Sequence, residues 1–257
     1  MKLHAATAMF PGDSYDSALS KLASNKVIDA GQSVSIAHVQ LCPQNHGKLS
    51  IEGLNLLKTR FNDSQFRLHA TCRLSVNGYR RYDASTPFEA SRSYFQEMSE
   101  LSKFVNAPAY SLHSGRRSES TLESMISNVF YIQDLFDCPV AVEGLYPAKG
   151  NRLLVSTWEE YKKLMLSGVF YALDMSHLNI VATKERYWDL ELLVELLSHP
   201  HCIEVHISGN NGYADKHEPI FVETLPAWWQ FMDHVGPNAV IFTESNQYMY
   251  SKKGVGQ

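Results

Sequence analysis

The sequence lacks the features that mark several large classes of protein. Lys and Arg number 23 against 27 Asp and Glu, the formal net charge is −4, and no stretch is strongly basic. Because non-specific nucleic-acid binding draws on clustered cationic side chains, the composition gives that function no support. No apolar run reaches the length of about 18 residues that spans a membrane, and no leader-like apolar core is seen at the start. We therefore expect a cytoplasmic protein without a membrane partner.

The cysteines do not form a metal-binding or disulfide pattern. The four of them, at 42, 72, 138 and 202, are far apart and make no CxxC pair. We therefore expect free thiols, and neither a disulfide framework nor a cysteine-rich zinc site. The glycine-rich signatures GxGxxG and GxxxxGK are also missing, which removes the motif of a Rossmann or P-loop nucleotide-binding protein.

Short apolar runs alternate with amphipathic segments along the whole chain. Eight runs predict strands: Leu3–Met9, Val34–Leu41, Phe66–Thr71, Ala109–His113, Val140–Glu143, Phe170–Asp174, Ile203–His206 and Ala239–Glu244. The segments between them have the apolar periodicity of helices. The chain has 257 residues, close to the length of about 250 that is typical of a TIM barrel. The pattern predicts a (β/α)8 TIM barrel of the α/β class, with residues 1–257 forming one domain.

Three predicted helices begin with the Ser/Thr-x-x-Glu pattern of a capping box. The pairs are Thr86–Glu89, Ser120–Glu123 and Ser156–Glu159. In such a box the hydroxyl and the carboxylate satisfy backbone N–H groups of the first turn. Pro87 is expected at the first helical position, where its missing N–H costs nothing.

Imidazole and carboxylate side chains fall at the C-terminal ends of six successive predicted strands. They are His69, His113, Glu143, Asp174, His206 and Glu244, and His177, Asp215 and His217 follow closely. In a TIM barrel these ends converge on one mouth, where active sites lie. So many buried ionisable groups would be unpaired or would repel one another without a cation. The nine residues therefore predict a metal centre, in which we expect Glu143 and Asp174 also to take part in the reaction.

The motifs that hold these residues resemble those of the xylose isomerase-like TIM barrels, and among them the trinuclear site of the endonuclease IV type. The motifs are RLHA, YSLHSG, AVEG, ALDMSH, EVHISG, ADKH and FTESN. The resemblance implies a first ion bound by His69, His113 and Glu143. It implies a second ion that shares Glu143 and takes Asp174, His206 and Glu244. The third ion would take His177, Asp215 and His217.

Within this superfamily, two stretches are more similar to the multinuclear nonheme iron-dependent oxidases, which include the methanobactin-biosynthesis oxidase. They are EVHISGNNGYADKHEPI, with the WW that follows it, and GPNAVIFTESN. The resemblance implies an oxidoreductase that uses two or three iron ions and oxygen to modify cysteines of a ribosomally made peptide. It also implies a cysteine-containing peptide substrate and a separate peptide-recognition partner protein.

Two alternatives stay open. An endonuclease IV-like zinc-dependent phosphodiesterase would use the same ligands, but HATCRLSV stands where that family carries a stretch used near DNA, so nucleic acid is not the expected partner. A metal-dependent sugar isomerase or epimerase needs one ion and would leave His177, Asp215 and His217 unused. Imidazole and carboxylate ligands suit zinc or manganese as well as iron, so the ligand set leaves the metal open.

Two arginines follow the predicted ligand His113 in the motif HSGRRS. Arg116 and Arg117 are therefore expected at the same mouth, where a guanidinium can bind an anionic group through two parallel hydrogen bonds. The alternative is that both are solvated loop residues. We assign Arg116 to the catalytic site.

Overall fold

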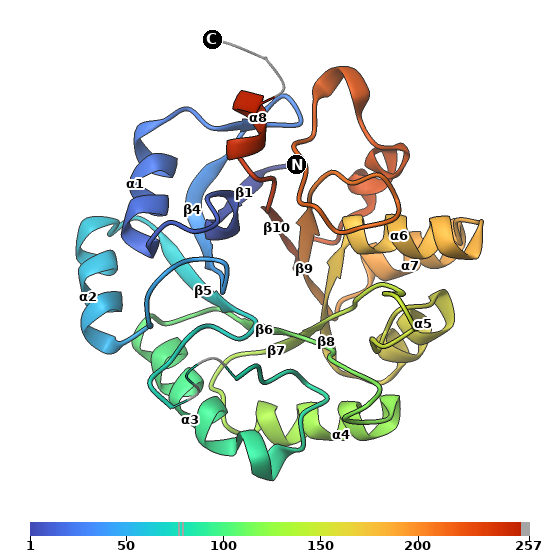
Figure 1. Ribbon diagram of the computed structural model, residues 1–257, viewed down its shortest axis with the longest axis horizontal. Coiled ribbons are helices and arrows are strands. Elements are labelled where there is room, and N and C mark those ends of the chain that lie inside the picture. Colours follow the sequence, from blue (N-terminus) through green and yellow to red (C-terminus); the bar gives the residue numbers. More distant parts are fainter. Residues whose placement is uncertain (77, 79, 253–257) are drawn as a thin grey trace.

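The computed structural model describes residues 1–76, 78 and 80–252. Eight parallel strands close into a barrel in the order β1-β10-β9-β8-β7-β6-β5-β4, and helices surround it (Figure 1). The barrel strands are β1 (Leu3–Ala6), β4 (Ser35–Leu41), β5 (Gln65–His69), β6 (Tyr110–His113), β7 (Val140–Glu143), β8 (Phe170–Asp174), β9 (Cys202–Ile207) and β10 (Val240–Thr243). The prediction of a TIM barrel is confirmed.

The helices lie around the barrel (Figure 1), and most of them bury apolar side chains against it. They are α1 (Tyr15–Ser24), α2 (Ile51–Arg60), α3 (Phe88–Phe104), α4 (Leu122–Gln133), α5 (Trp158–Leu166), α6 (Met175–Glu185), α7 (Leu190–Ser198) and α8 (Tyr248–Lys252). In α3, for example, Tyr94, Phe95 and Met98 are fully buried at helical spacing. Within the described part of the chain, no helix is long and apolar enough to cross a membrane.

Some boundaries differ from the predicted ones. The first predicted strand ends at Ala6, because Thr7–Met9 turn into the 3-10 helix η1 and the Thr7 hydroxyl accepts a hydrogen bond from the backbone N–H of Cys42. Two further 3-10 helices, η2 (Val222–Thr224) and η3 (Ala227–His234), precede β10. The short antiparallel pair of β2 (Ile28–Asp29) and β3 (Gln32–Ser33) was not predicted.

Two of the capping boxes are shifted by one residue. Thr121 and Thr157 cap α4 and α5, because their hydroxyls accept hydrogen bonds from the third N–H of each helix. The hydroxyls of Ser120 and Ser156 are used locally instead, on the carbonyl oxygens of Thr121 and Leu153. At α3, Pro87 takes the N-cap rather than the first helical position.

The inner side chains of the barrel lie in layers, because every second residue of a strand points inward. The layer at the C-terminal ends includes His69, His113 and His206. Two residues earlier on the same strands, Arg67, Ser111 and Glu204 form the layer beneath, where Arg67 Nη1 lies 3.0 Å from Glu204 Oε1. All of this second layer is buried.

Candidate metal centre

Strand register brings the predicted ligands to one level of the barrel. His113 pairs with Glu143 between β6 and β7, and Asp174 pairs with His206 between β8 and β9. Glu244 follows β10, and its N–H donates to the carbonyl of Ile207 at the end of β9. Most of these side chains are buried, but that of His113 is 31% exposed, so the site opens to solvent beside this residue.

Glu143 lies at the centre of the site. Its Oε2 atom is 3.2 Å from His69 Nε2 and 3.3 Å from His206 Nδ1. The same atom is 3.7 Å from His113 Nε2, and Oε1 is 3.3 Å from His177 Nδ1. One carboxylate thus reaches imidazoles from four different βα units, which is the placement expected of a bridging ligand.

Asp215, in the loop after β9, is a second carboxylate that lies between imidazoles. Its Oδ2 atom lies 3.3 Å from His177 Nε2 and 3.3 Å from His217 Nε2. The other ring nitrogen of His217 is 3.3 Å from Glu244 Oε2, and His177 Nε2 is 3.5 Å from Asp174 Oδ2. All nine predicted residues therefore belong to one continuous cluster.

The ligand atoms fall into overlapping groups whose members lie within 4.8 Å of one another. Two of the groups, His69–His113–Glu143 and Asp174–His206–Glu244, contain ligands that the resemblance assigns to the first and second ions. Two more, Glu143–Asp174–His177 and His69–Glu204–His206, overlap them. None of these groups, among the described residues, contains Asp215 or His217, so the set implied for a third ion is not gathered as closely as the other two.

Four buried atoms at the centre have no hydrogen-bond partner among the described residues. They are Glu143 Oε2, His206 Nδ1, His217 Nδ1 and Glu244 Oε1. Buried polar atoms in proteins are nearly always hydrogen-bonded, so four such atoms facing one space need an explanation. Bound cations would provide one, and a mixed imidazole and carboxylate set is one that zinc, iron and manganese accept. The residues fit a metal centre.

The charges of the cluster are strongly coupled. Burial opposes ionisation of Glu143, but the imidazoles of His113 and His206 hold the pKa of its carboxyl well below the usual value. Burial lowers the pKa of His69 to about 3, so this ring stays neutral, the form that binds metal. Burial also opposes protonation of His206, but the Glu143 carboxylate raises its pKa well above the usual value. Protons and cations therefore compete for this imidazole.

Two residues that the sequence analysis did not predict contact the imidazoles of His206 and His69 on the ring nitrogens that do not face Glu143. Glu204 Oε2 is 3.3 Å from His206 Nε2, and Ser111 Oγ is 3.0 Å from His69 Nδ1. Both stand two residues before a predicted ligand on a strand, so inward alternation could have identified them. Such partners fix the ring orientation and the tautomer of a metal-binding histidine.

Two further supports come from loops. Asp83 Oδ1 lies 3.7 Å from His113 Nδ1, and the carbonyl oxygen of Gly144 lies 2.9 Å from His177 Nδ1. Asp83 lies in the long loop between β5 and α3, and no local sequence signal places it near His113. In both histidines the second ring nitrogen faces the cluster.

The two arginines after His113 have different surroundings. Arg117 forms a bidentate ion pair with Glu160, at 2.7 and 2.8 Å. Arg116 is exposed, and it lines a cavity of about 550 Å³ beside the mouth. Of the two, Arg116 is the one whose guanidinium is available to a substrate.

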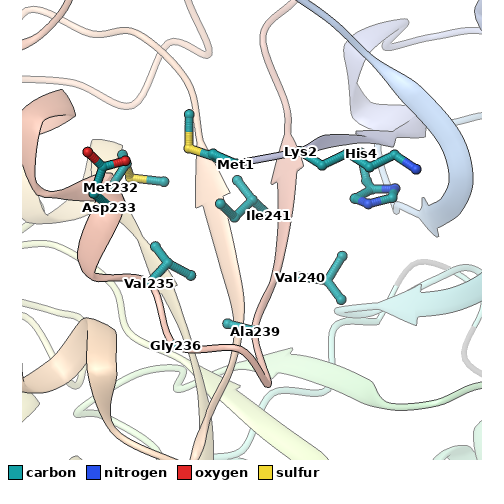
Figure 2. Close-up of a pocket in the computed structure, with 10 residues that line it drawn as sticks. All are labelled: Met1, Lys2, His4, Met232, Asp233, Val235, Gly236, Ala239, Val240 and Ile241. Atoms are coloured by element: carbon teal, nitrogen blue, oxygen red, sulfur yellow. The ribbon is translucent and has the colours of Figure 1, made fainter.

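A separate cavity of about 290 Å³ lies at the opposite end of the barrel. Figure 2 shows its lining residues, which include Lys2 and His4 of the first strand region and Val240 and Ile241 of β10. None of the nine candidate ligands lines it. Because TIM-barrel active sites lie at the C-terminal face, this cavity is not the candidate site.

Comparison with known proteins identifies the fold. No protein-family model matches the chain, and no curated protein matches it. A D-tagatose 3-epimerase-like protein is 16% identical over 98% of this chain and 95% of its own, with a TM-score of 0.69. AP endonuclease, family 2, from Brucella melitensis is 15% identical over 96% of this chain and 93% of its own, with a TM-score of 0.66. A xylose isomerase domain containing protein from Salmonella typhimurium LT2 is 16% identical over 97% of this chain and 90% of its own, with a TM-score of 0.66. These likenesses show the fold, a TIM barrel similar to those of xylose isomerase-like proteins.

Proposed function

We propose that this protein is a multinuclear metal-dependent hydrolase of phosphodiesters. The observation that carries the proposal is the cluster of nine imidazole and carboxylate side chains around Glu143 and Asp215, in which four buried ligand atoms have no hydrogen-bond partner among the described residues. When bound, divalent ions would polarise a phosphoryl oxygen and lower the pKa of a water molecule, so that hydroxide can attack the phosphorus near neutral pH and displace the alcohol of the ester.

The residues beyond Glu143 support more than one ion. A single ion of the kind that an isomerase or epimerase uses would be satisfied by Glu143, Asp174, His206 and Glu244. It would leave Asp215 between two imidazoles, each 3.3 Å away, with no role in the reaction. A second carboxylate placed between two imidazoles favours a multinuclear site over the single-metal site of a sugar isomerase.

The surroundings of the mouth favour phosphate chemistry. Arg116 comes three residues after the partly exposed ligand His113, and its guanidinium matches the oxygens of a phosphate group. One of the similar structures is an AP endonuclease, which supports phosphodiester chemistry on this fold. In this proposal Glu143 holds two ions together, Asp174 and Glu244 complete the shell, and Arg116 orients the substrate.

A second candidate function is the oxidation of a cysteine-bearing peptide by an iron form of the same centre. The resemblance of the His206–His217 and Pro237–Asn246 stretches to the peptide-modifying oxidases favours it. It requires iron, oxygen, a cysteine-containing peptide and a separate peptide-recognition partner. The two candidates differ in metal, in oxygen requirement and in substrate, so one set of assays separates them.

The test loads the purified protein separately with Zn²⁺, Mn²⁺ or Fe²⁺. Each form is assayed for hydrolysis of bis(p-nitrophenyl) phosphate, for cleavage of an abasic duplex and for oxygen uptake with a cysteine peptide. We expect phosphodiester hydrolysis without oxygen consumption, and its loss in Glu143→Gln. Glu159→Gln, which changes an exposed carboxylate on α5, is the matched control and should keep the activity. Oxygen uptake by the iron form with no hydrolysis by any form would select the oxidase instead.

A further inference from the structure

The loops after β5, β6 and β7 form a pocket rich in arginine beside the candidate metal centre. Its volume is about 550 Å³, and its lining includes Arg81, Arg116, Arg117, Tyr146 and Arg152. Four guanidinium groups around one cavity are unusual in a chain whose net charge is −4. The pocket therefore concentrates positive charge at one place on an otherwise acidic molecule.

Backbone hydrogen bonds fix the loops after β6 and β7 against each other. Arg116 and Leu153 form an antiparallel bridge, and the N–H of Arg117 donates to the carbonyl of Arg152 at 2.9 Å. The N–H of Arg116 also donates to Ser85 Oγ at 2.9 Å. Arg116 and Arg152 are thus anchored by a rigid backbone pairing, and little order has to be imposed on the backbone when a ligand binds.

Gly115 makes this close pairing possible. Its φ angle of +94° is one that side chains disfavour, and a Cβ atom there would overlap Ser85. The absence of a side chain lets the loop after β6 lie against Ser85 and aims the next residue, Arg116, at the pocket. The local sequence is thus suited to positioning this guanidinium.

Among the described residues, a carboxylate neutralises one of the pocket arginines, Arg117. Glu160 pairs with Arg117 through both of its oxygens. Among the described residues, no ion pair holds Arg81, Arg116 or Arg152, and all three are exposed. Arg81, Arg116 and Arg152, which have no ion pair in the described part of the chain, thus remain to bind an anion.

The pocket borders the metal centre on two sides. Tyr146, three residues after Glu143, packs its ring 4.8 Å from the ring of His177. Arg81 lines both this pocket and an adjoining cavity of about 220 Å³, whose lining includes His113. A molecule held by the arginines can therefore extend toward the ligands at the mouth.

We infer that the arginine pocket binds a second phosphate group of the substrate, while the phosphodiester to be cleaved lies at the metal centre; this inference rests on the proposed function. A terminal phosphate is a dianion with three oxygens, and several guanidinium forks match it better than they match a single carboxylate. The bounded cavity and the lack of other basic stretches point to a small bisphosphorylated molecule rather than a long polyanion.

The binding test uses thymidine 3′,5′-bisphosphate as the probe and calorimetry of the metal-loaded protein. The variant combines Arg116→Ala and Arg152→Ala, and the matched control combines Arg60→Ala and Arg92→Ala on the outer helices α2 and α3. We expect the pocket variant to bind the probe about 100-fold more weakly, roughly tenfold for each lost charge-assisted contact, and the control to bind it as the wild type does. Equal affinity in all three proteins would overturn the inference.

A kinetic test distinguishes failure of the pocket from failure of the proposed reaction. Thymidine 5′-(p-nitrophenyl phosphate) is compared with the same ester carrying a 3′-phosphate. The wild type should prefer the 3′-phosphorylated ester, and the pocket variant should lose that preference. If neither ester is cleaved but bisphosphate binding depends on the two arginines, the pocket is supported and the hydrolase is refuted. If both are cleaved with equal kcat/KM by the wild type, the pocket is refuted.

Discussion

Glu204 lies directly beneath His206, and its Oε2 atom is 3.3 Å from Nε2 of that imidazole. The other ring nitrogen of His206 faces Glu143 Oε2 at 3.3 Å. One nitrogen is therefore turned to a buried carboxylate and the other to the metal centre. This is the arrangement in which a carboxylate orients a metal-binding histidine and increases its basicity.

The first prediction follows from this contact. Glu204→Gln keeps the shape of the side chain but removes the charge behind His206. We expect the affinity for metal to fall by about 10- to 100-fold, the range typical of a lost outer-shell partner. The measurement is metal retention during titration with a chelator, read by elemental analysis.

Arg67→Met is the control for this variant. Arg67 is paired with the same carboxylate, its Nη1 atom lying 3.0 Å from Glu204 Oε1, whereas the other carboxylate oxygen faces His206. Either change breaks a buried ion pair, which costs about 3–5 kcal/mol of stability. If Arg67→Met loses as much metal as Glu204→Gln, the effect is one of folding and not of ligand orientation.

The second prediction concerns the number of ions that each ligand holds. Glu143 reaches the imidazoles of His69 and His206 from one oxygen, whereas His217 lies beside Asp215. Glu143→Ala should therefore lose more metal per chain than His217→Ala, because a bridging ligand serves two ions. Elemental analysis of both variants, purified without chelators, tests this. Equal losses would show that the ligands are assigned to the wrong ions.

The third prediction uses Gly144, which follows Glu143 directly. A Cβ atom at this position would overlap the ring of Tyr161, and that ring is fixed because its hydroxyl donates to the carbonyl of Leu145 at 2.8 Å. Gly144→Ala should destabilise the protein by about 1–3 kcal/mol, as overpacking does. It should also weaken metal binding, since the Gly144 carbonyl orients His177. Thermal unfolding and metal content are the two measurements.

Gly53→Ala is the matched control for that substitution. Gly53 lies within α2, and the one atom near its added Cβ would be Ser50 Oγ at 3.6 Å, an ordinary contact. Here alanine should stabilise the helix by about 0.5–1 kcal/mol. If both variants lost a similar amount of stability, the overlap with Tyr161 would not be the cause of the effect at Gly144.

The fourth prediction is a pH dependence of stability at Asp13. This carboxylate accepts hydrogen bonds from Lys21 Nζ at 2.6 Å and from the Tyr248 hydroxyl at 2.7 Å, and so ties α1 to α8. Burial opposes ionisation, but these bonds lower the pKa of Asp13 below its usual value. The stabilisation is therefore complete above the unfolded pKa of about 3.9 and is lost as the pH falls through the lower folded value.

Asp13→Asn should accordingly cost about 1 kcal/mol at pH 7, with little difference from the wild type once the pH lies below the folded pKa. Urea unfolding at a series of pH values measures this. Asp63→Asn, an exposed change after α2, should have no such profile. A constant deficit at every pH would show that the amide disturbs packing and that the charge is not responsible.

The sequence predicts the candidate ligands better than the residues that orient them. Apolar runs place His69, His113 and Glu143 at strand ends, and parallel register then brings strand ends together. Glu204 was within reach of the same reasoning, because it stands two residues before His206 on the inward face. Asp83 was not, since its position depends on how a long loop folds back on β6.

The same distinction applies to the fold. The strands β7 and β8 match their predicted limits, because a buried parallel strand is a short apolar run with clear ends. The caps at Thr121 and Thr157 are displaced from the predicted Ser residues, because two neighbouring hydroxyls compete and backbone geometry selects between them. The hairpin of β2 and β3 has two residues per strand, too few for any periodic signal.

The position of β10 links formation of the candidate metal centre to closure of the barrel. This strand lies between β1 and β9, so it both closes the barrel and brings Glu244 to the other ligands. Until it is in place, a growing chain exposes two open sheet edges and holds a cluster of carboxylates and imidazoles without its last member. Completion of the candidate metal site and closure of the barrel therefore depend on the same strand.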